Sequence, residues 1–193
     1  PCRSACPANV DIPGYLALVS EGRIAEALRL HRERNPLAAV CARVCFHSCE
    51  TKCRHTLVDG ESVAIRGVKR FMADQEVTVQ LPDVRENPEN AKKKIAIIGA
   101  GPAGLSCGYF LARMGYKPQI FEAEERPGGM LVQAIPAYRL PREILAREVR
   151  MIENMGVEIQ TGKKLGRDFT LEGLKEQGYE AVFLGVGAPQ GSK

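Results

Sequence analysis

The chain contains no tryptophan, and aromatic residues of all kinds make up only 6% of its 193 residues. A surface that stacks nucleic-acid bases needs aromatic side chains, so this scarcity argues against one. The net charge is only +4, with acids interspersed among the basic residues, so neither nucleic acid nor an anionic membrane is indicated as a partner. No apolar run approaches the roughly 20 residues that span a bilayer, and the amino terminus lacks the apolar core of a signal peptide. We therefore expect a cytoplasmic protein that binds neither nucleic acid nor membrane.

Cysteine, in contrast, is concentrated at one end: six of the seven lie within the first 53 residues. Clustered thiols in a reducing compartment bind metal more often than they form disulfides or stay free. Thiolates suit iron–sulfur clusters and zinc alike, although structural zinc typically uses closer pairs and often a histidine. The sequence therefore predicts a metal site and leaves both metals open. The candidate ligands are Cys2, Cys6, Cys41, Cys45, Cys49 and Cys53.

The last four of these cysteines recur at every fourth position. They cannot all face inward from one straight helix, because each step drifts by about 40° at 3.6 residues per turn. A turn must interrupt the run, and we place it at His47 and Ser48. His47 and His55 lie near the cysteines in sequence, but we expect them to lie at the surface or to support the ligands rather than to bind the metal themselves.

Residues 1–75 are predicted to be helical. Asp11 can cap a helix that has Pro13 in its first turn, and a second amphipathic stretch begins at Ile24. A further helix is expected over residues 63–74. Its predicted buried side consists of Val63, Gly67, Val68 and Phe71.

Residues 76–93 carry prolines and asparagines and are predicted to connect the helical part to a second domain, residues 94–193. In that second domain predicted strands alternate with predicted helices, which implies a parallel sheet. The predicted strands cover 95–98, 117–121, 157–160 and 181–184. The predicted helices cover 103–114, 141–155 and 171–177.

Gly99, Gly101 and Gly104 form the pattern G-x-G-x-x-G between a predicted strand and a predicted helix. The first glycine permits a tight turn, the second lets the backbone approach a pyrophosphate, and the third lets the helix pack closely on the strand. The amides and the dipole of the helix start attract the phosphates. Glu122 ends the next strand, where a carboxylate accepts from ribose hydroxyls and repels a 2′-phosphate. The pattern predicts a dinucleotide site that disfavours NADP.

A pair of glycines, Gly128 and Gly129, follows Glu122 after five intervening residues. Such a pair lets a second backbone segment approach the cofactor. A flavin dinucleotide is longer than NAD and can use this additional contact. Cys107 lies on the helix after the glycine turn and is expected to be a small buried side chain.

Four segments of the second domain are distinctive: G-A-G-P-A-G-L-S-C, E-A-E-E-R-P-G-G-M-L, I-P-A-Y-R-L-P and G-Y-E-A-V-F-L-G-V-G-A. They resemble the FAD-binding half of the glutamate synthase small-subunit family. That family includes the amino-terminal electron-entry region of dihydropyrimidine dehydrogenase and related NADPH-dependent flavin/iron–sulfur oxidoreductases. Two more, C-R-S-A-C-P-A-N-V-D-I-P-G-Y and V-C-F-H-S-C-E-T-K-C, resemble its helical domain, which typically holds two [4Fe–4S] clusters. The resemblance implies an α-helical iron–sulfur domain followed by an α/β Rossmann-like FAD domain with a parallel sheet.

The resemblance also implies contacts with FAD. Residues 99–103 would wrap the diphosphate, and residues 122–130 would hold the adenosine ribose and lead toward the flavin. Val186 stands where the family often has threonine. The implied cofactor-binding residues are Gly99, Ala100, Gly101, Pro102, Ala103, Gly104, Glu122, Gly128, Gly129, Met130, Leu131, Arg139, Leu165 and Gly187.

For the clusters, the resemblance assigns Cys2 and Cys53 to one and the group Cys6, Cys45 and Cys49 to the other. The sequence departs from the family twice. The chain begins at Pro1 without a further upstream C-x-x-C, and Lys69 stands where some relatives use a glutamine or glutamate ligand.

An ammonium cannot ligate iron, and Cys41 is an extra thiol placed to replace the ligand lost at Lys69. We predict one complete cluster on Cys6, Cys41, Cys45 and Cys49. Cys2 and Cys53 would then be remnants of a second cluster site, or residues upstream of the sequence would complete that site.

The implied activity is that of an NAD(P)H oxidoreductase, in which NADPH reduces FAD and single electrons pass to [4Fe–4S] clusters and an electron-accepting partner subunit or domain. No catalytic acid–base pair or nucleophile is predicted. The chain has no second glycine fingerprint before Lys193, so we expect a truncated piece, inactive alone, of a protein that works in a hetero-oligomer. Two alternatives remain: a non-catalytic FAD/iron–sulfur electron-transfer module, and a zinc-stapled NAD-binding domain.

Overall fold

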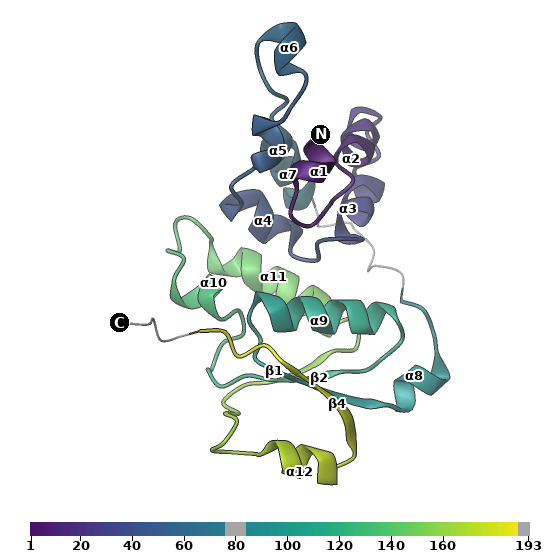
Figure 1. The fold of residues 1–193 in the computed structure, drawn as a ribbon, viewed down its shortest axis with the longest axis vertical. Helices are drawn as coiled ribbons and strands as arrows, with labels where there is room; N and C mark the ends of the chain where they lie inside the picture. The colour runs from purple at the N-terminus through teal and green to yellow at the C-terminus, as the bar shows by residue number, and fades with distance from the viewer. Residues whose placement is uncertain (76–83, 189–193) are drawn as a thin grey trace. The chain divides into compact units, whose positions relative to one another are not determined.

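The computed structural model describes residues 1–75 and 84–188. The chain divides into two compact units, Pro1–Gln80 and Leu81–Lys193, here called the first and second units (Figure 1). Within the described residues, no helix is both long and apolar enough to cross a membrane.

The first unit is built from short helices, as its sequence predicts. The side chain of Asp11 accepts a hydrogen bond from the amide of Gly14 at 3.4 Å, and Pro13 lies in the first turn, so the helix begins where the cap signal places it. The helices are α1 (Cys2–Ala5), α2 (Ile12–Ser20), α3 (Ile24–Arg32), α4 (Ala38–Val44), α5 (Ser48–Thr51), α6 (Thr56–Asp59) and α7 (Ile65–Asp74).

The helices of the first unit enclose a core in which α2 packs on α3 and α4 packs on α7. Burial of apolar side chains contributes about 25 cal/mol per Å² to such a core. The buried Tyr15 hydroxyl donates to the carbonyl of Ile65 at 3.4 Å, which ties α2 to the start of α7. The buried residues of the cluster are Val10, Ile12, Tyr15, Ala27, Leu28, Ala38, Cys49, Ile65 and Met72.

The predicted buried side of α7 is correct in part for Val63 and Val68, which pack against the core, and wrong for Gly67 and Phe71. Phe71 is 50% exposed and Gly67 is exposed, while Val63 and Val68 are half-buried. The residues that face inward are Ile65, Lys69, Met72 and Ala73. Positions i, i+4 and i+7 share one face of a helix, and the sequence analysis missed this face because it contains a lysine.

The turn predicted within the cysteine run is confirmed. Helix α4 ends at Val44, and the backbone of the next residue, Cys45, is extended. His47 adopts left-handed backbone angles with φ of 45°, and α5 begins at Ser48. The reversal at His47 changes the direction of the chain between the second and third cysteines of the run.

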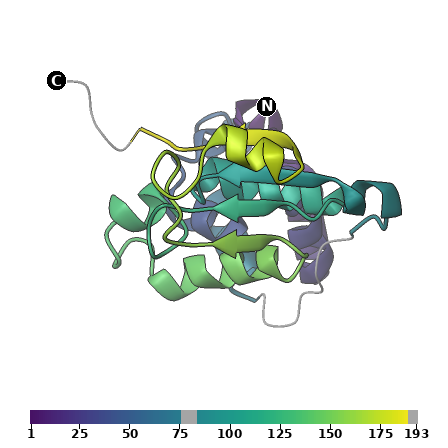
Figure 2. The ribbon, with the colours of Figure 1, turned by 90° about the horizontal axis from the view of Figure 1, so that it is seen from below.

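The second unit contains the predicted parallel sheet, which is confirmed. Its order is β3-β2-β1-β4 and every neighbouring pair is parallel (Figure 2). Helices α9 and α11 lie on one side of the sheet and α12 on the other (Figure 1). The strands are β1 (Lys94–Ile98), β2 (Gln119–Phe121), β3 (Glu158–Gln160) and β4 (Tyr179–Leu184). The helices are α8 (Pro88–Lys92), α9 (Pro102–Arg113), α10 (Met130–Gln133), α11 (Arg142–Glu153) and α12 (Leu171–Glu176).

The strand order reverses beside β1, which carries the buried residues Ala96, Ile97 and Ile98. From β1 the chain runs outward through β2 and β3, and then returns to place β4 on the other side of β1. In open α/β sheets, ligands bind outside the carboxyl ends of the strands at such a switch point. The glycine turn that follows β1 lies at this position.

Part of the predicted connector is helical. Residues 76–83 lie outside the described residues, but α8 follows Asn87, whose side chain accepts from the amides of Glu89 and Asn90 at 3.1 and 3.2 Å. The Asn90 side chain donates to the carbonyl of Met114 at 2.9 Å, at the end of α9. The described end of the connector therefore lies on the second unit.

Candidate functional site

The three glycines of the turn after β1 have different surroundings. Gly99 has φ of +101°, and a Cβ at this position would lie 2.4 Å from the carbonyl oxygen of Gly185. A Cβ on Gly104 would lie 1.8 Å from the carbonyl oxygen of Gly99. A Cβ on Gly101 would meet no described atom within 4 Å. The first and third glycines are therefore required by the fold, whereas the second leaves open space beside the start of α9.

The glycine pair approaches this open space from a second segment. A Cβ on Gly129 would lie 3.0 Å from the Cα of Gly101. The amide of Gly128 donates to the carbonyl of Ala100 at 2.8 Å. Met130, which starts α10, is 49% exposed, and Leu131 is buried. Backbone from two segments thus borders the open space at Gly101. A side chain at this position would fill that space, which suits a pyrophosphate.

The carboxylate of Glu122 is buried at the end of β2, with the residue 6% exposed. One oxygen accepts from the amide of Ala100 at 2.6 Å, and the other accepts from the amide of Glu124 at 2.9 Å. Each carboxylate oxygen has a second lone pair for a further donor. Glu122 therefore fixes the glycine turn against β2 and keeps capacity to accept from a ribose hydroxyl.

The remaining predicted FAD contacts lie on separate segments. Pro102 and Ala103 are in the first turn of α9. Arg139 is exposed in the segment before α11. Leu165 is half-buried and forms an isolated bridge with Phe169, and Gly187 is exposed with φ of +68° after β4.

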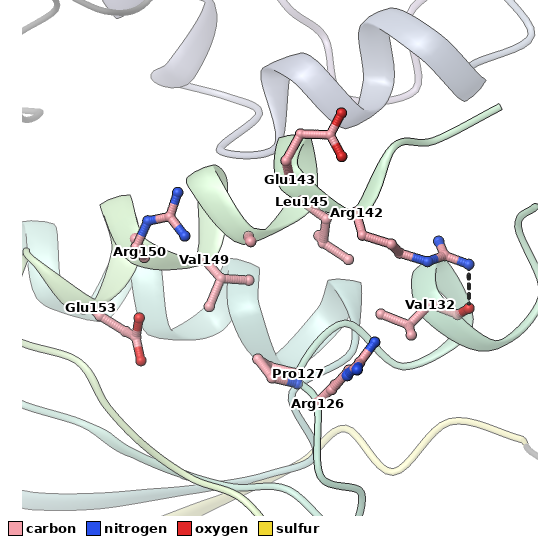
Figure 3. A pocket seen from close by; sticks show the side chains of 10 residues that line it. Arg126, Pro127, Val132, Arg142, Glu143, Leu145, Val149, Arg150 and Glu153 are labelled. Carbon is pink, nitrogen blue, oxygen red and sulfur yellow. Dashed lines mark hydrogen bonds between the residues drawn. The ribbon is translucent and has the colours of Figure 1, made fainter. Parts of the chain in front are cut away.

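Arg142 is a residue that the sequence analysis missed. Its guanidinium donates to the carbonyls of Leu131, Val132 and Ile135 at 3.0, 2.8 and 2.8 Å. Figure 3 shows the bond to Val132. The carbonyls of Leu131 and Val132 belong to α10, which gives them no helical partner, and the carbonyl of Ile135 lies just beyond the end of this helix. Arg142 thereby holds the segment that follows the glycine pair. The available signal was an arginine directly after Leu-Pro at a helix start.

Arg142 also borders a pocket of about 430 Å³ beside α11 (Figure 3). Apolar side chains form much of its wall, and charged side chains of both signs surround them. The wall includes Pro127, Val132, Leu145 and Val149, together with Arg126, Glu143, Arg150 and Glu153.

In the first unit, four cysteines line one cavity of about 280 Å³. They are Cys6, Cys41, Cys45 and Cys49. Among the described residues, Cys2 and Cys53 do not line this cavity. No three His, Cys, Asp or Glu side chains in the described ranges converge closely enough to hold a single metal ion. The four thiols instead surround a shared cavity. A set of four thiol donors fits an iron–sulfur cluster.

Other groups of this cavity are held neutral by burial. The pKa of His31 is lowered to about 3, chiefly by burial and in part by the nearby cations Lys69 and Arg32. Burial also raises the pKa of Tyr15, with smaller contributions from the cysteines, and burial raises the pKa of the Cys49 thiol. Proton transfer to His31 or from Tyr15 is therefore unfavourable near neutral pH.

The two histidines near the cysteines differ. His47 is half-buried and lines the cavity, with Nδ1 3.0 Å from a carboxylate oxygen of Glu50. His55 is exposed, with Nε2 3.0 Å from Asp59. His55 therefore has the expected surface position, whereas the left-handed turn places His47 beside the cavity, where it can support the ligands, the other role expected for it.

Comparisons with known proteins show which family this chain resembles. Residues 1–81 match the family model described as dihydropyrimidine dehydrogenase domain II, 4Fe–4S cluster. Residues 97–135 match the NAD(P)-binding Rossmann-like domain. The glutamate synthase [NADPH] small chain of Escherichia coli is 39% identical over 98% of this chain and 40% of its own length. The resemblance to the glutamate synthase small-subunit family is confirmed.

Two other relatives are similar over nearly the whole chain. The NADP(+)-dependent formate dehydrogenase subunit beta of Moorella thermoacetica is 44% identical over 100% of this chain and 30% of its own length. The NADPH-Fe(3+) oxidoreductase subunit beta of Geobacter sulfurreducens is 46% identical over 97% of this chain and 28% of its own length. The chain therefore spans less than half the length of these curated relatives.

Proposed function

We propose that this chain is the part of an NAD(P)H-dependent flavin/iron–sulfur oxidoreductase that holds FAD and one [4Fe–4S] cluster. Residues 1–75 are the cluster domain, residues 76–93 the linker, and residues 94–193 the incomplete FAD domain. In the complete protein, electrons pass from NADPH through FAD to the cluster and on to a partner subunit. The relatives that are named as beta subunits or small chains support this assignment to a hetero-oligomer.

The observation that carries the proposal is the cavity that Cys6, Cys41, Cys45 and Cys49 line together. Thiolates are the ligands that iron–sulfur clusters prefer. Because Cys6 is remote in sequence from the other three, only the packing of the helices brings this donor set together. The match of residues 1–81 to a 4Fe–4S family model supports the same assignment.

The glycine turn and the glycine pair would hold the pyrophosphate of FAD. Gly101 leaves the backbone open to a phosphate, and the amides of the first turn of α9, which have no partner within the helix, would donate to it. Glu122 would accept from a ribose hydroxyl, and its charge opposes a 2′-phosphate. FAD has no such phosphate, so the site suits FAD, and NADPH would bind elsewhere in the complete protein. FAD supplies the conversion of a two-electron donor into single-electron transfers.

Anaerobic reconstitution with iron and sulfide tests the cluster. The wild-type chain should hold about four irons. Cys41→Ser should lose most of this iron, whereas Cys53→Ser should keep it. A chain that binds zinc and nearly no iron would instead support the zinc-stapled alternative, and a Cys41→Ser variant with full iron content would contradict the ligand set.

A rescue experiment sharpens the same test. Glutamine at position 69 is the residue type that some relatives use as a ligand. The double variant Cys41→Ser/Lys69→Gln should therefore regain iron that Cys41→Ser loses. If the double variant remains iron-poor while Cys53→Ser is full, position 69 does not face the cluster.

A further inference from the structure

A lysine lies inside the cysteine cavity. Lys69 is 9% exposed on the inward face of α7 and lines the cavity with the four thiols. Its Nζ donates a hydrogen bond to the sulfur of Cys45 at 3.2 Å. Within the described ranges, Lys69 forms no ion pair with a carboxylate.

The other charged groups near Cys45 do not compensate the positive charge of Lys69. The side chain of Arg66 donates to the carbonyl of Cys45 at 3.4 Å, which adds a second cation. The carboxylate of Glu50 is directed elsewhere, because it accepts from the amide of Arg66 at 2.7 Å and lies 3.0 Å from His47. His31 is neutral, as its lowered pKa requires. A buried ammonium without a compensating charge is costly, so this cavity is suited to an anionic occupant.

We propose that Lys69 compensates the negative charge of the cluster and raises its reduction potential. This inference rests on the proposed function. Hydrogen bonds to the sulfurs and the net charge around a cluster set its potential. One added electron makes the cluster more negative by one unit, and the ammonium at Cys45 stabilises that reduced form more than the oxidised form. At position 69 a ligand used by some relatives is thus replaced by a cation, while Cys41 supplies the fourth thiolate.

The test is the midpoint potential of the reconstituted chain, followed by electron paramagnetic resonance during an anaerobic titration with dithionite. Lys69→Met keeps an apolar stem of similar length and removes the charge. It should shift the ratio of reduced to oxidised cluster at least tenfold toward the oxidised form, a fall of about 59 mV for one electron. Lys69→Arg keeps the charge and should remain close to wild type.

Lys52→Met is the matched control. Lys52 is exposed in the same unit, does not line the cavity, and its loss changes the net charge equally. Its potential should equal that of wild type, because exposed charges are screened. An equal fall in Lys52→Met and Lys69→Met would overturn the inference.

The remaining outcomes separate the inference from the proposed function. A potential in Lys69→Met equal to or above wild type, with about four irons in both, would overturn the inference alone. Loss of iron in Lys69→Met but not in Lys69→Arg would support it, because the charge is then required. Loss in both variants would overturn it. A wild-type chain without iron would overturn the proposed function itself.

Discussion

At the residue scale, Gly101 and Gly104 separate cofactor binding from folding. Gly101→Ala adds a methyl group where no described atom lies within 4 Å, at a φ of −72° that alanine adopts freely. We expect its free energy of unfolding to stay near wild type. Its affinity for FAD should fall at least tenfold, because the methyl occupies the space proposed for the pyrophosphate. Quenching of flavin fluorescence measures the affinity, and unchanged binding would contradict the placement.

Gly104→Ala is the opposite case. Its Cβ would lie 1.8 Å from a backbone oxygen, so α9 has to move away from β1. The free energy of unfolding should fall by about 3 kcal/mol. Gly67→Ala is the control, since it is exposed on α7 and its Cβ would lie 3.6 Å from the nearest atom. That control should be neutral or stabilising by about 0.5–1 kcal/mol. Denaturant titration followed by circular dichroism compares the two.

Cys107 should react slowly with alkylating reagents. Burial raises the pKa of this thiol, and only the thiolate reacts. At any pH below the raised pKa, the thiolate fraction is therefore smaller than in an ordinary cysteine. The rate of alkylation by iodoacetamide should rise at a higher pH in the folded chain than in the urea-unfolded chain, as peptide mass spectrometry would show. Coincident pH profiles would mean that the helix does not shield the thiol.

At the scale of elements, local signals predicted much of the structure. The cap at Asp11 and the strand–glycine–helix pattern around Gly99 are encoded by neighbouring residues, and both were predicted correctly. The four-residue helices α1, α5, α6 and α10 were not predicted individually, because one turn is too short to show a periodicity. The buried face of α7 was assigned wrongly in part, because Lys69 is buried only where the folded chain places sulfur beside it.

Arg142 should determine the order of α10. Arg142→Ala leaves the carbonyls of Leu131, Val132 and Ile135 without their charged donor. Since these groups are partly buried, we expect a loss of about 1–3 kcal/mol in the free energy of unfolding. Arg150→Ala on the same helix removes an exposed arginine and should stay within about 0.5 kcal/mol of wild type.

Hydrogen exchange provides the more specific readout for Arg142. Amides of residues 130–135 should lose protection in Arg142→Ala, while amides of β1 should keep theirs. Equal effects of Arg142→Ala and Arg150→Ala would show that the three hydrogen bonds do not stabilise α10.

At the scale of the whole molecule, the candidate thiol ligands could be predicted from the sequence, but the cavity that they line could not. Cys6 precedes α2, whereas Cys41, Cys45 and Cys49 lie on or beside α4 and α5. The cavity exists only because these elements pack around the core that Tyr15 and Ile65 share. The cavity and the inward position of Lys69 result from tertiary packing, so no local sequence periodicity predicts them. The glycine turn needed no such packing to be recognised, because its residues are contiguous.

Removal of iron should therefore affect the two units differently. A cluster on Cys6, Cys41, Cys45 and Cys49 would link the segment before α2 to α4 and α5, and binding energy in such a site is folding energy. Once a chelator has removed the iron, the thiols no longer hold these elements together and the charge of Lys69 loses its compensation. Amides of α4, α5 and α7 should lose protection from hydrogen exchange, whereas those of β1 and α9 should retain it. Equal losses in both units would contradict a cluster confined to the first, and unchanged protection in α4 and α5 would show that the cavity is rigid without metal.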